Sequence, residues 1–360
     1  MHSTIRASAG ALALSMALIS AMQAGQGGGG ASPRYQVLAP ITQGNLTVFP
    51  VAANSTHDTS GFSTLDEGLR SGEVVVTETG QRGGGLVRRR GIPIPPPGGA
   101  EVNHLFIVNN SKRPLVLLAG EIVTGGKQDR VVGKDRIIPA GSDADLDVFC
   151  VEPGRWTELR GASGFGGGVT MAGPSVRNQA MAKKSQQGVW DRVNDSKAEA
   201  VEVLAGDAAE LGDTTSYARV RDNAKVRNEV EKVAAPIERS YQTVIGQLRE
   251  QKAVGVVVAV NGDIIWADIF ASPALLEKYW PKLVRSYAAE AITHRGSAGA
   301  PTLKEAQAFL ARLEGSHEQT DTEPGVYRHT EITGSGYKVF ELTSLLPGTG
   351  FDVHVSKMAD

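Results

Sequence analysis

Residues 34–360 are predicted to form a single large α+β domain, in which a mostly antiparallel sheet from N-terminal and central strands packs against helices. Three observations predict this class. The chain of 360 residues is 41% hydrophobic and 21% charged, a globular composition that can bury a sizeable core. Short β-prone runs dominate residues 34–160, whereas residues 161–315 are mainly helical around a hairpin at residues 254–270. Strand-like runs return in residues 316–360.

Residues 1–24 have the composition of an export signal. Arg6 supplies a positive start, residues 7–20 are apolar or small, and small residues surround a cut expected after Ala24. Residues 25–33 form a glycine-rich tether. No later stretch reaches the ~20 consecutive apolar residues of a membrane-spanning helix. We therefore expect a bacterial protein, periplasmic or secreted after cleavage, with no membrane span in the mature chain.

The first half is expected to be rich in strands. Residues 35–38, 46–52 and 73–77 are short β-prone runs, and the capping-box pattern of residues 63–67 predicts a short helix between the last two. A long surface loop is predicted for the stretch rich in Gly, Arg and Pro at residues 80–100. An antiparallel set with tight turns is predicted from the runs at residues 102–108, 114–118, 121–124, 130–138 and 146–151.

The pattern changes at the glycine cluster of residues 161–168, after which apolar residues recur at spacings of three and four over residues 175–251. Asn261-Gly262, between two apolar runs, suits the type I′ turn of a hairpin. A helix should start at Ser272 and Pro273, and Pro281 should kink or divide it. A capped helix from Thr302 to Gly315 and strands at residues 326–330, 337–343 and 351–355 complete the expected elements.

Charge and cysteine content exclude several classes of protein. The chain has 37 basic and 39 acidic residues, so its net charge of −2 gives no general reason to bind nucleic acid. The histidines form no spacing typical of a metal site, so no metal is expected. The single cysteine, Cys150, has no partner for an internal disulfide. We expect it to be a small buried side chain, with a catalytic nucleophile as the alternative.

The most varied chemistry lies in residues 117–130. Here Glu121, Lys127, Gln128 and Arg130 surround the glycine pair Gly125 and Gly126. Glycines allow the backbone to approach a ligand closely, and the polar side chains supply a carboxylate, an amide and two cations. The stretch is not a phosphate-binding P-loop, because Glu stands where the first glycine is required and Gln replaces the magnesium-binding Ser or Thr. This composition predicts a recognition site without specifying a reaction.

A ligand site forms if the strands that carry these residues pair. Lysine and arginine side chains would then hold a phosphate or carboxylate, and Gln128 would recognise a carbonyl or amide group. Glu121 or Glu152 could act as a general base, and Trp156 and Trp190 could stack on a planar ring or sugar. The candidate set is Glu121, Gly125, Gly126, Lys127, Gln128, Arg130, Glu152, Arg155, Trp156 and Trp190, with Cys150 as a further catalytic candidate. Alternatively, these charges form a buried structural network and the tryptophans belong to the core.

Five stretches resemble one known family: residues 117–130, 150–156, 187–190, 254–270 and 280–283. Their Gly-Gly-Lys-Gln and Cys-Val-Glu-x-Gly-Arg-Trp motifs are similar to those of the ARPP family, a domain associated with ADP-ribosylglycohydrolase-like and rhodanese-phosphatase-like proteins. The resemblance covers residues 34–295 and does not extend past about residue 300. It implies a link to nucleotide or ADP-ribose-type metabolites, but the family has no settled activity, and the cofactor is unknown.

Two functions are consistent with the sequence. In the first, this exported domain binds, and in a stronger form processes, a phosphorylated or nucleotide-like small molecule through the Glu, Lys, Gln and Arg cluster. In the second, it is a non-enzymatic envelope protein that binds a protein or surface partner. Residues 80–100 and the glycine cluster near residue 165 would then form the contact surface. The sequence does not decide whether the protein is an enzyme.

Overall fold

The largest element of the computed structural model is an antiparallel sheet of nine strands, counted over the residues that the structure describes. These are residues 34–78, 103–154, 165–204, 211, 214–248, 251–294, 296 and 299–360. The predicted loop of residues 80–100 therefore lies outside the described residues. The strand order is β1 (Tyr35–Val37), β3 (Leu46–Ala53), β13 (Lys252–Val260), β14 (Asp263–Phe270), β18 (Asp352–Ala359), β17 (Tyr337–Ser344), β16 (Tyr327–Gly334) and β15 (His317–Glu323), with β2 (Ile41–Gln43) paired to β3.

The middle of the sheet joins distant parts of the chain. Strand β3 pairs with β13, so that Leu46 lies opposite Val260, and β14 pairs with the C-terminal strand β18. Between β13 and β14, Asn261 and Gly262 have φ values of +54° and +92°, the left-handed conformation that a type I′ turn needs. The predicted hairpin and the predicted sheet of N-terminal and central strands are both confirmed.

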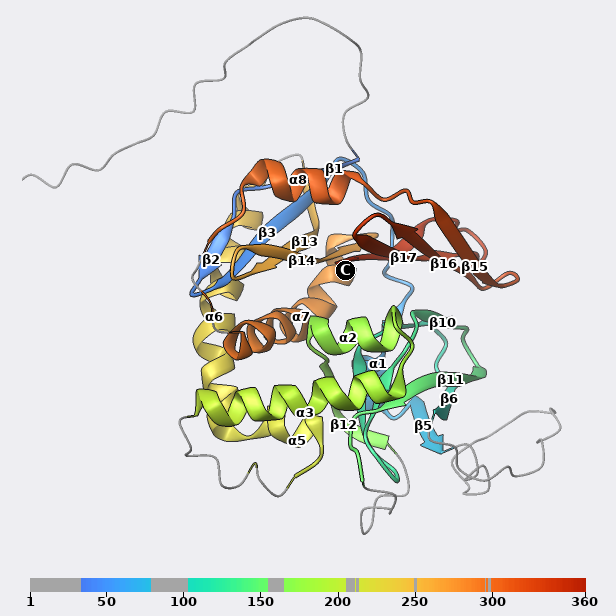
Figure 1. Ribbon diagram of the computed structural model, residues 1–360. Helices are drawn as coiled ribbons and strands as arrows, with labels where there is room; N and C mark the ends of the chain where they lie inside the picture. The colour runs from blue at the N-terminus through green and yellow to red at the C-terminus, as the bar shows by residue number, and fades with distance from the viewer. Residues whose placement is uncertain are drawn as a thin grey trace, which may run out of the picture. The chain divides into compact units, whose positions relative to one another are not determined.

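Helices cover both faces of this sheet, as Figure 1 shows for α8 and α7. On one face, Phe49 and Val51 pack with Leu310 of α8 (Leu303–Ala311). On the other face, the core cluster that includes Val48 and Val256 contains side chains of α6 (Ala224–Gly246) and α7 (Pro273–Thr293). Burial on both faces explains why β13 is an almost unbroken apolar run rather than an alternating one.

A second β structure is a closed barrel. Its strands follow the order β11 (Ser142–Cys150), β6 (His104–Asn109), β5 (Val74–Glu78), β12 (Phe165–Met171), β8 (Glu121–Gly125) and β9 (Arg130–Val132). Val76, Ile107 and Val123 belong to its apolar core. The outward-facing Ile122 and Val131 pack instead against α2 (Pro174–Met181) and α3 (Gln186–Val203).

Two predictions for this region were incomplete. The run at residues 130–138 is two strands, because β9 joins the barrel and β10 (Arg136–Ile138) joins a small sheet with β7 (Leu115–Leu117) and β4 (Ser63–Thr64). The pairing of β4 with β7 is parallel, which the prediction of a mostly antiparallel sheet allows. Residues 161–168 do not end the strands, since β12 begins at Phe165 and contains three glycines of that cluster. Glycine carries no β propensity, so the pattern did not predict this strand.

The helices follow the predicted signals closely. Helix α1 (Leu65–Ser71) has the capping box predicted within residues 63–67, formed by Thr64 and Glu67, and α8 has that of Thr302 and Glu305. Helix α7 was predicted to be kinked or divided at Pro281; it is not divided, because it continues as one helix through that residue. Because Pro281 is exposed while the neighbouring Tyr279, Trp280 and Leu283 are buried, tertiary packing maintains the helix across the missing backbone hydrogen bond.

Candidate functional site

A cleft with a volume of about 670 Å³ lies in the described part of the chain. Its walls come from α1, α6, α7, β12 and the short helix α5 (Tyr217–Asp222). Charged side chains dominate its lining, together with the apolar Met171, Val230 and Pro281. A volume of this size is in the range that holds a nucleotide-sized ligand, roughly 300–1,000 Å³.

Lys282 of α7 lines this cleft and is bonded to two carboxylates. Its ammonium group donates to Asp66 Oδ2 and, at 2.5 Å, to Glu121 Oε1. The side chain of Lys282 is 9% exposed and that of Glu121 is fully buried. Burial by itself lowers the pKa of Lys282, but the carboxylates of Glu121 and Asp66 outweigh this effect and raise the pKa. Lys282 therefore carries a positive charge at neutral pH.

Lys278, one turn before Lys282, forms a second link between α7 and α1. Its ammonium group lies 3.0 Å from Glu67 Oε1 and donates to the backbone carbonyl of Phe62. Glu67 also accepts a hydrogen bond from the backbone N–H of Thr64 at 2.9 Å. Burial opposes ionisation of Glu67, but the bonds from Lys278 and Thr64 lower its pKa. Glu67 is therefore held by its own helix as well as by Lys278.

Three arginines of the cleft have no carboxylate partner among the described residues: Arg70, Arg221 and Arg227. Arg221 donates to the backbone carbonyl of Arg285, whereas Arg70 and Arg227 are exposed and form no ion pair in this part of the chain. Arg285 differs, because it pairs with Glu231 at 2.6 Å and with Glu238 at 3.4 Å. Guanidinium groups hold phosphate and carboxylate groups in bidentate geometry, so these arginines can bind an anion.

One residue of the cleft lining has a buried hydroxyl group without a partner among the described residues. Thr170 of β12 lines the cleft, and its Oγ1 atom is buried without a hydrogen-bond partner among the described residues. A buried hydroxyl group usually has a partner. The Thr170 hydroxyl is therefore an unsatisfied group next to the cleft, covered by protein atoms.

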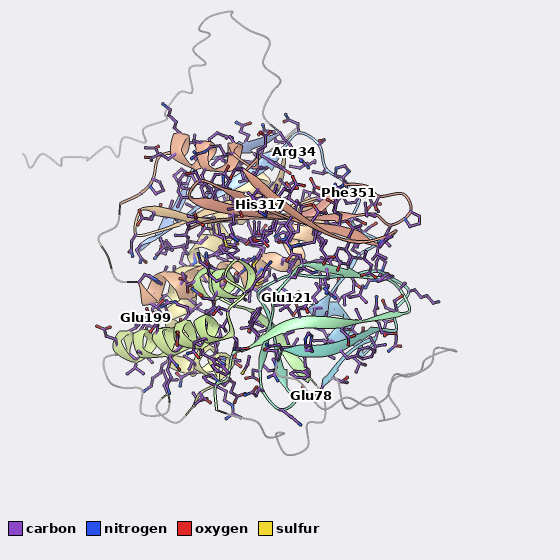
Figure 2. All side chains as sticks on the ribbon, turned by 45° about the vertical axis from the view of Figure 1, so that its right-hand side comes forward. Arg34, Glu78, Glu121, Glu199, His317 and Phe351 are labelled. Carbon is purple, nitrogen blue, oxygen red and sulfur yellow. The ribbon has the colours of Figure 1, made fainter. Side chains whose placement is uncertain are left out.

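The structure divides the predicted recognition residues between two places. Glu121 begins β8, and its Oε2 atom accepts a hydrogen bond from the backbone N–H of Leu118. Gly125 ends β8, about 13 Å away at the usual rise of a strand. Figure 2 shows Glu121 between the large sheet and the barrel, whereas Glu78 lies at the far end of the barrel. Among the predicted residues that the structure describes, Glu121 is bonded to a side chain that lines the cleft.

The residues that follow Gly125 gather around the turn between β8 and β9. Gly125 and Gly126 have φ values of +127° and +50°, and the backbone N–H of Lys127 donates to Glu78 at 2.9 Å. Arg130 is fully buried with its guanidinium 4.0 Å from Glu78. The glycines here permit a tight turn over a buried charge pair.

Gln128 and Glu152 are brought together, as the sequence predicted for paired strands. The Gln128 side chain donates to the backbone carbonyl of Glu152 at 3.2 Å. The carboxylate of Glu152 accepts from the backbone N–H of Asp129, and Asp129 in turn accepts from Gly125 and Ser216. These bonds connect the barrel to the start of α5. They favour the alternative in which this group of residues is a structural network.

The remaining candidates are placed as follows. Cys150 is buried, burial raises the pKa of its thiol, and the backbone N–H of Glu152 donates to its sulfur. A thiol that stays protonated is a poor nucleophile. Trp190 lies half-buried on α3. Arg155 and Trp156 lie outside the described residues.

A buried polar network was not anticipated from the sequence. Asp268 of β14 is fully buried and accepts two hydrogen bonds from Arg177 of α2, at 2.9 and 3.0 Å, and one from Tyr287. His354 of β18 contacts Asp268 through Nε2 at 3.2 Å and Asp135 through Nδ1 at 2.6 Å. The network joins the sheet, α2, α7 and the segment between β9 and β10. These residues are far apart in the chain, and no local motif marks them.

Two absences apply to the described residues alone. They contain no group of three or more His, Cys, Asp or Glu residues arranged to hold a metal ion. Their helices include none that is both long and apolar enough to cross a membrane.

The fold and cleft define an α+β protein with a charged, ligand-sized cleft beside a closed barrel. The model of one family, the ARG and Rhodanese-Phosphatase-superfamily-associated Protein domain (ARPP-1), matches residues 34–358. The chain therefore belongs to the ARPP-1 family. This confirms the resemblance seen in the sequence and extends it past residue 300, where the motifs gave no support. No curated protein and no solved structure matches the chain.

Proposed function

We propose that the protein binds a phosphorylated, nucleotide-sized small molecule in the cleft between α1, α6 and α7. The observation that carries this proposal is the set of Arg70, Arg221 and Arg227 around a cleft of about 670 Å³, with no carboxylate partner among the described residues. A protein surface that presents unpaired arginines in a concave site is suited to an anionic ligand. The apolar side chains of Met171 and Val230 offer contact area to the uncharged part of the ligand.

This proposal keeps the ligand class inferred from the sequence but places the ligand elsewhere. Gln128, Asp129 and Glu152 bond to one another and to neighbouring backbone groups, and Arg130 lies inside the barrel beside Glu78. Such internal bonds support a structural role for that group. Glu121 is the member that supports the cleft, because it holds Lys282 in place.

Substitution of Arg227 tests the proposal. We expect one or more members of a panel of nucleotides, ADP-ribose and sugar phosphates to raise the midpoint of thermal unfolding of residues 25–360. A ligand present at 100 times its dissociation constant adds about 2.7 kcal/mol of stability. Arg227→Ala should weaken binding roughly tenfold, because a hydrogen bond to a charged group contributes about 1.5–3 kcal/mol.

The control for this experiment lies on the same helix. Arg239 of α6 is also exposed and does not line the cleft, so Arg239→Ala removes an equal charge without touching the site. A ligand that loses affinity equally in both variants would be responding to net charge alone. A panel that gives no shift with the unsubstituted protein would contradict the proposal.

We further infer that the protein is exported, so that its ligand is met in the periplasm or outside the cell. The inference rests on the positive, apolar and small-residue segments of residues 1–24. Expression of the full chain in a bacterial host should yield a shortened protein in the periplasmic fraction. N-terminal sequencing that finds Met1 intact on cytoplasmic protein would rule the inference out.

A further inference from the structure

Lys282 has two carboxylate partners that differ in how firmly each is held. Glu121 is fully buried, and its second oxygen accepts a hydrogen bond from the backbone N–H of Leu118 at 2.7 Å. Asp66 is 22% exposed, and Lys282 is its one partner in the described part of the chain. Glu121 is therefore a fixed partner of the lysine, whereas Asp66 is free to turn into solvent.

The neighbouring pair on the same two helices shows that this freedom is specific to Asp66. Glu67 contacts Lys278, but it also closes the capping box of α1 through the backbone N–H of Thr64. Displacing Glu67 would break a bond within its own helix. Displacing Asp66 would break a bond to Lys282 alone, and Lys282 would keep Glu121.

From this asymmetry we propose that Asp66 takes the place of the ligand's anionic group at Lys282, and that the phosphorylated ligand binds by displacing it. The proposal rests on the function proposed above and specifies where the ligand's phosphate lies. Both Asp66 and Lys282 line the cleft that Arg70, Arg221 and Arg227 surround. A phosphate on Lys282 would thus lie within a cleft that holds three arginines without a carboxylate partner in the described part of the chain.

The charge around Lys282 explains why Asp66 affects the binding of an anion. The carboxylate of Asp66 offsets the positive charge of Lys282 and so opposes the binding of an anion there. Burial raises the pKa of Glu121, although Lys282 acts in the opposite direction, so the buried acid resists ionisation. Asp66 is therefore the carboxylate that competes most directly with a ligand's phosphate.

The test compares two substitutions that remove the same charge from the same cleft. Asp66→Asn should tighten the binding of inorganic pyrophosphate, measured by isothermal titration calorimetry, on the order of tenfold. Asp222→Asn is the matched control, because Asp222 lines the cleft but is exposed and has no ion pair among the described residues. Its effect should stay below about threefold, since exposed charges are screened by salt.

Lys282 is tested with its fixed partner replaced at the same time. The double variant Lys282→Met and Glu121→Gln removes both charges, so no buried carboxylate is left unpaired. It should lose pyrophosphate binding. If it binds pyrophosphate as the unsubstituted protein does, Lys282 is not the phosphate site and the proposal is wrong. Asp66→Ser provides a second uncharged variant should Asp66→Asn fail to fold.

The outcomes separate this inference from the proposed function. Tighter binding by Asp66→Asn than by Asp222→Asn supports both. Equal effects of the two substitutions, with Arg227→Ala still weakening binding, overturn the displacement of Asp66 and leave the cleft as the ligand site. No binding of pyrophosphate or of any nucleotide by any form of the protein overturns both.

Discussion

The protonation state of His354 depends strongly on its surroundings. Both ring nitrogens face carboxylate oxygens, Nδ1 that of Asp135 and Nε2 that of Asp268, so both must carry protons to donate. Burial alone lowers the pKa of His354, but the two carboxylates outweigh it and raise the pKa to about 9 from the usual 6.5. With Arg177 on Asp268, two positive and two negative charges balance within the core.

This protonated histidine predicts a fall in stability above pH 6.5. A group whose pKa is raised on folding contributes stability that is complete below its unfolded-state pKa and is lost as the pH rises through its folded-state pKa. We expect the free energy of unfolding to decrease by roughly 1–2 kcal/mol between pH 6.5 and 8. Urea denaturation, followed by circular dichroism at several pH values, measures this free energy of unfolding. His354→Gln should lack this decrease, and an equal decrease in that variant would refute the assignment.

Two other buried groups define the window of that measurement. Burial lowers the pKa of His329 to about 4, so its contribution to stability is lost as the pH falls from 6.5 towards 4. Burial, assisted by Arg312, lowers the pKa of Lys357 to about 8, so Lys357 changes stability above pH 8. Of these three groups, His354 therefore contributes most to the change in the free energy of unfolding between pH 6.5 and 8.

Gly120 is required both by a local turn and by a contact in the tertiary structure. The sequence predicted a turn there, and the residue has a φ of +95°. A side chain at this position would also lie 2.7 Å from the aliphatic part of Arg177, which holds Asp268. The turn was predictable from the glycine, but the contact that requires the glycine comes from a helix more than fifty residues later.

At the scale of elements, the capping box of α1 both stabilises this helix and positions side chains of the cleft. Its capping box consists of Glu67 N–H donating to Thr64 Oγ1 at 3.3 Å and Thr64 N–H donating to Glu67 Oε2 at 2.9 Å. The helix carries Asp66 and Arg70 into the cleft wall. Because the cap fixes the start of the helix, it also fixes the position of these two side chains.

Thr64→Ala and Thr302→Ala form a matched pair of cap substitutions. Each removes the threonine of a capping box, in α1 and α8 respectively, and each should cost about 1 kcal/mol of stability in urea denaturation. Only Thr64→Ala should change the affinity for pyrophosphate, because α8 covers the other face of the sheet. Loss of affinity in Thr302→Ala of the same size would show that the effect is global destabilisation.

Elements that are marked by short-range sequence features were predicted. Strands β15 and β12, which lack such features, were missed. The Asn261-Gly262 turn and both capping boxes are short-range features, and each is present. Strand β15 was missed because all seven of its residues are exposed and polar, so it has no alternation of apolar and polar positions. Strand β12 was missed because it contains three of the glycines that marked the expected boundary.

At the scale of the molecule, the large sheet combines the two ends of the domain with its middle. Strands β1 to β3 come from its start, β13 and β14 from the middle, and β15 to β18 from its end. The core cluster below the sheet accordingly contains Leu46, Val256 and Val353. The family match to residue 358 agrees with this architecture, since the C-terminal strands complete the same sheet.

The sequence by itself determined the α+β class, the order of most helices and strands, and the family, because these depend on short-range periodicity and on motifs. It also singled out Glu121, which holds Lys282 in the structure. Only the tertiary structure decided that Glu121 and Gln128 lie apart, and that Asp66, Arg227 and Lys282 share a cleft. Charged residues on different helices carry no pattern that relates them along the chain, so their convergence follows from packing alone.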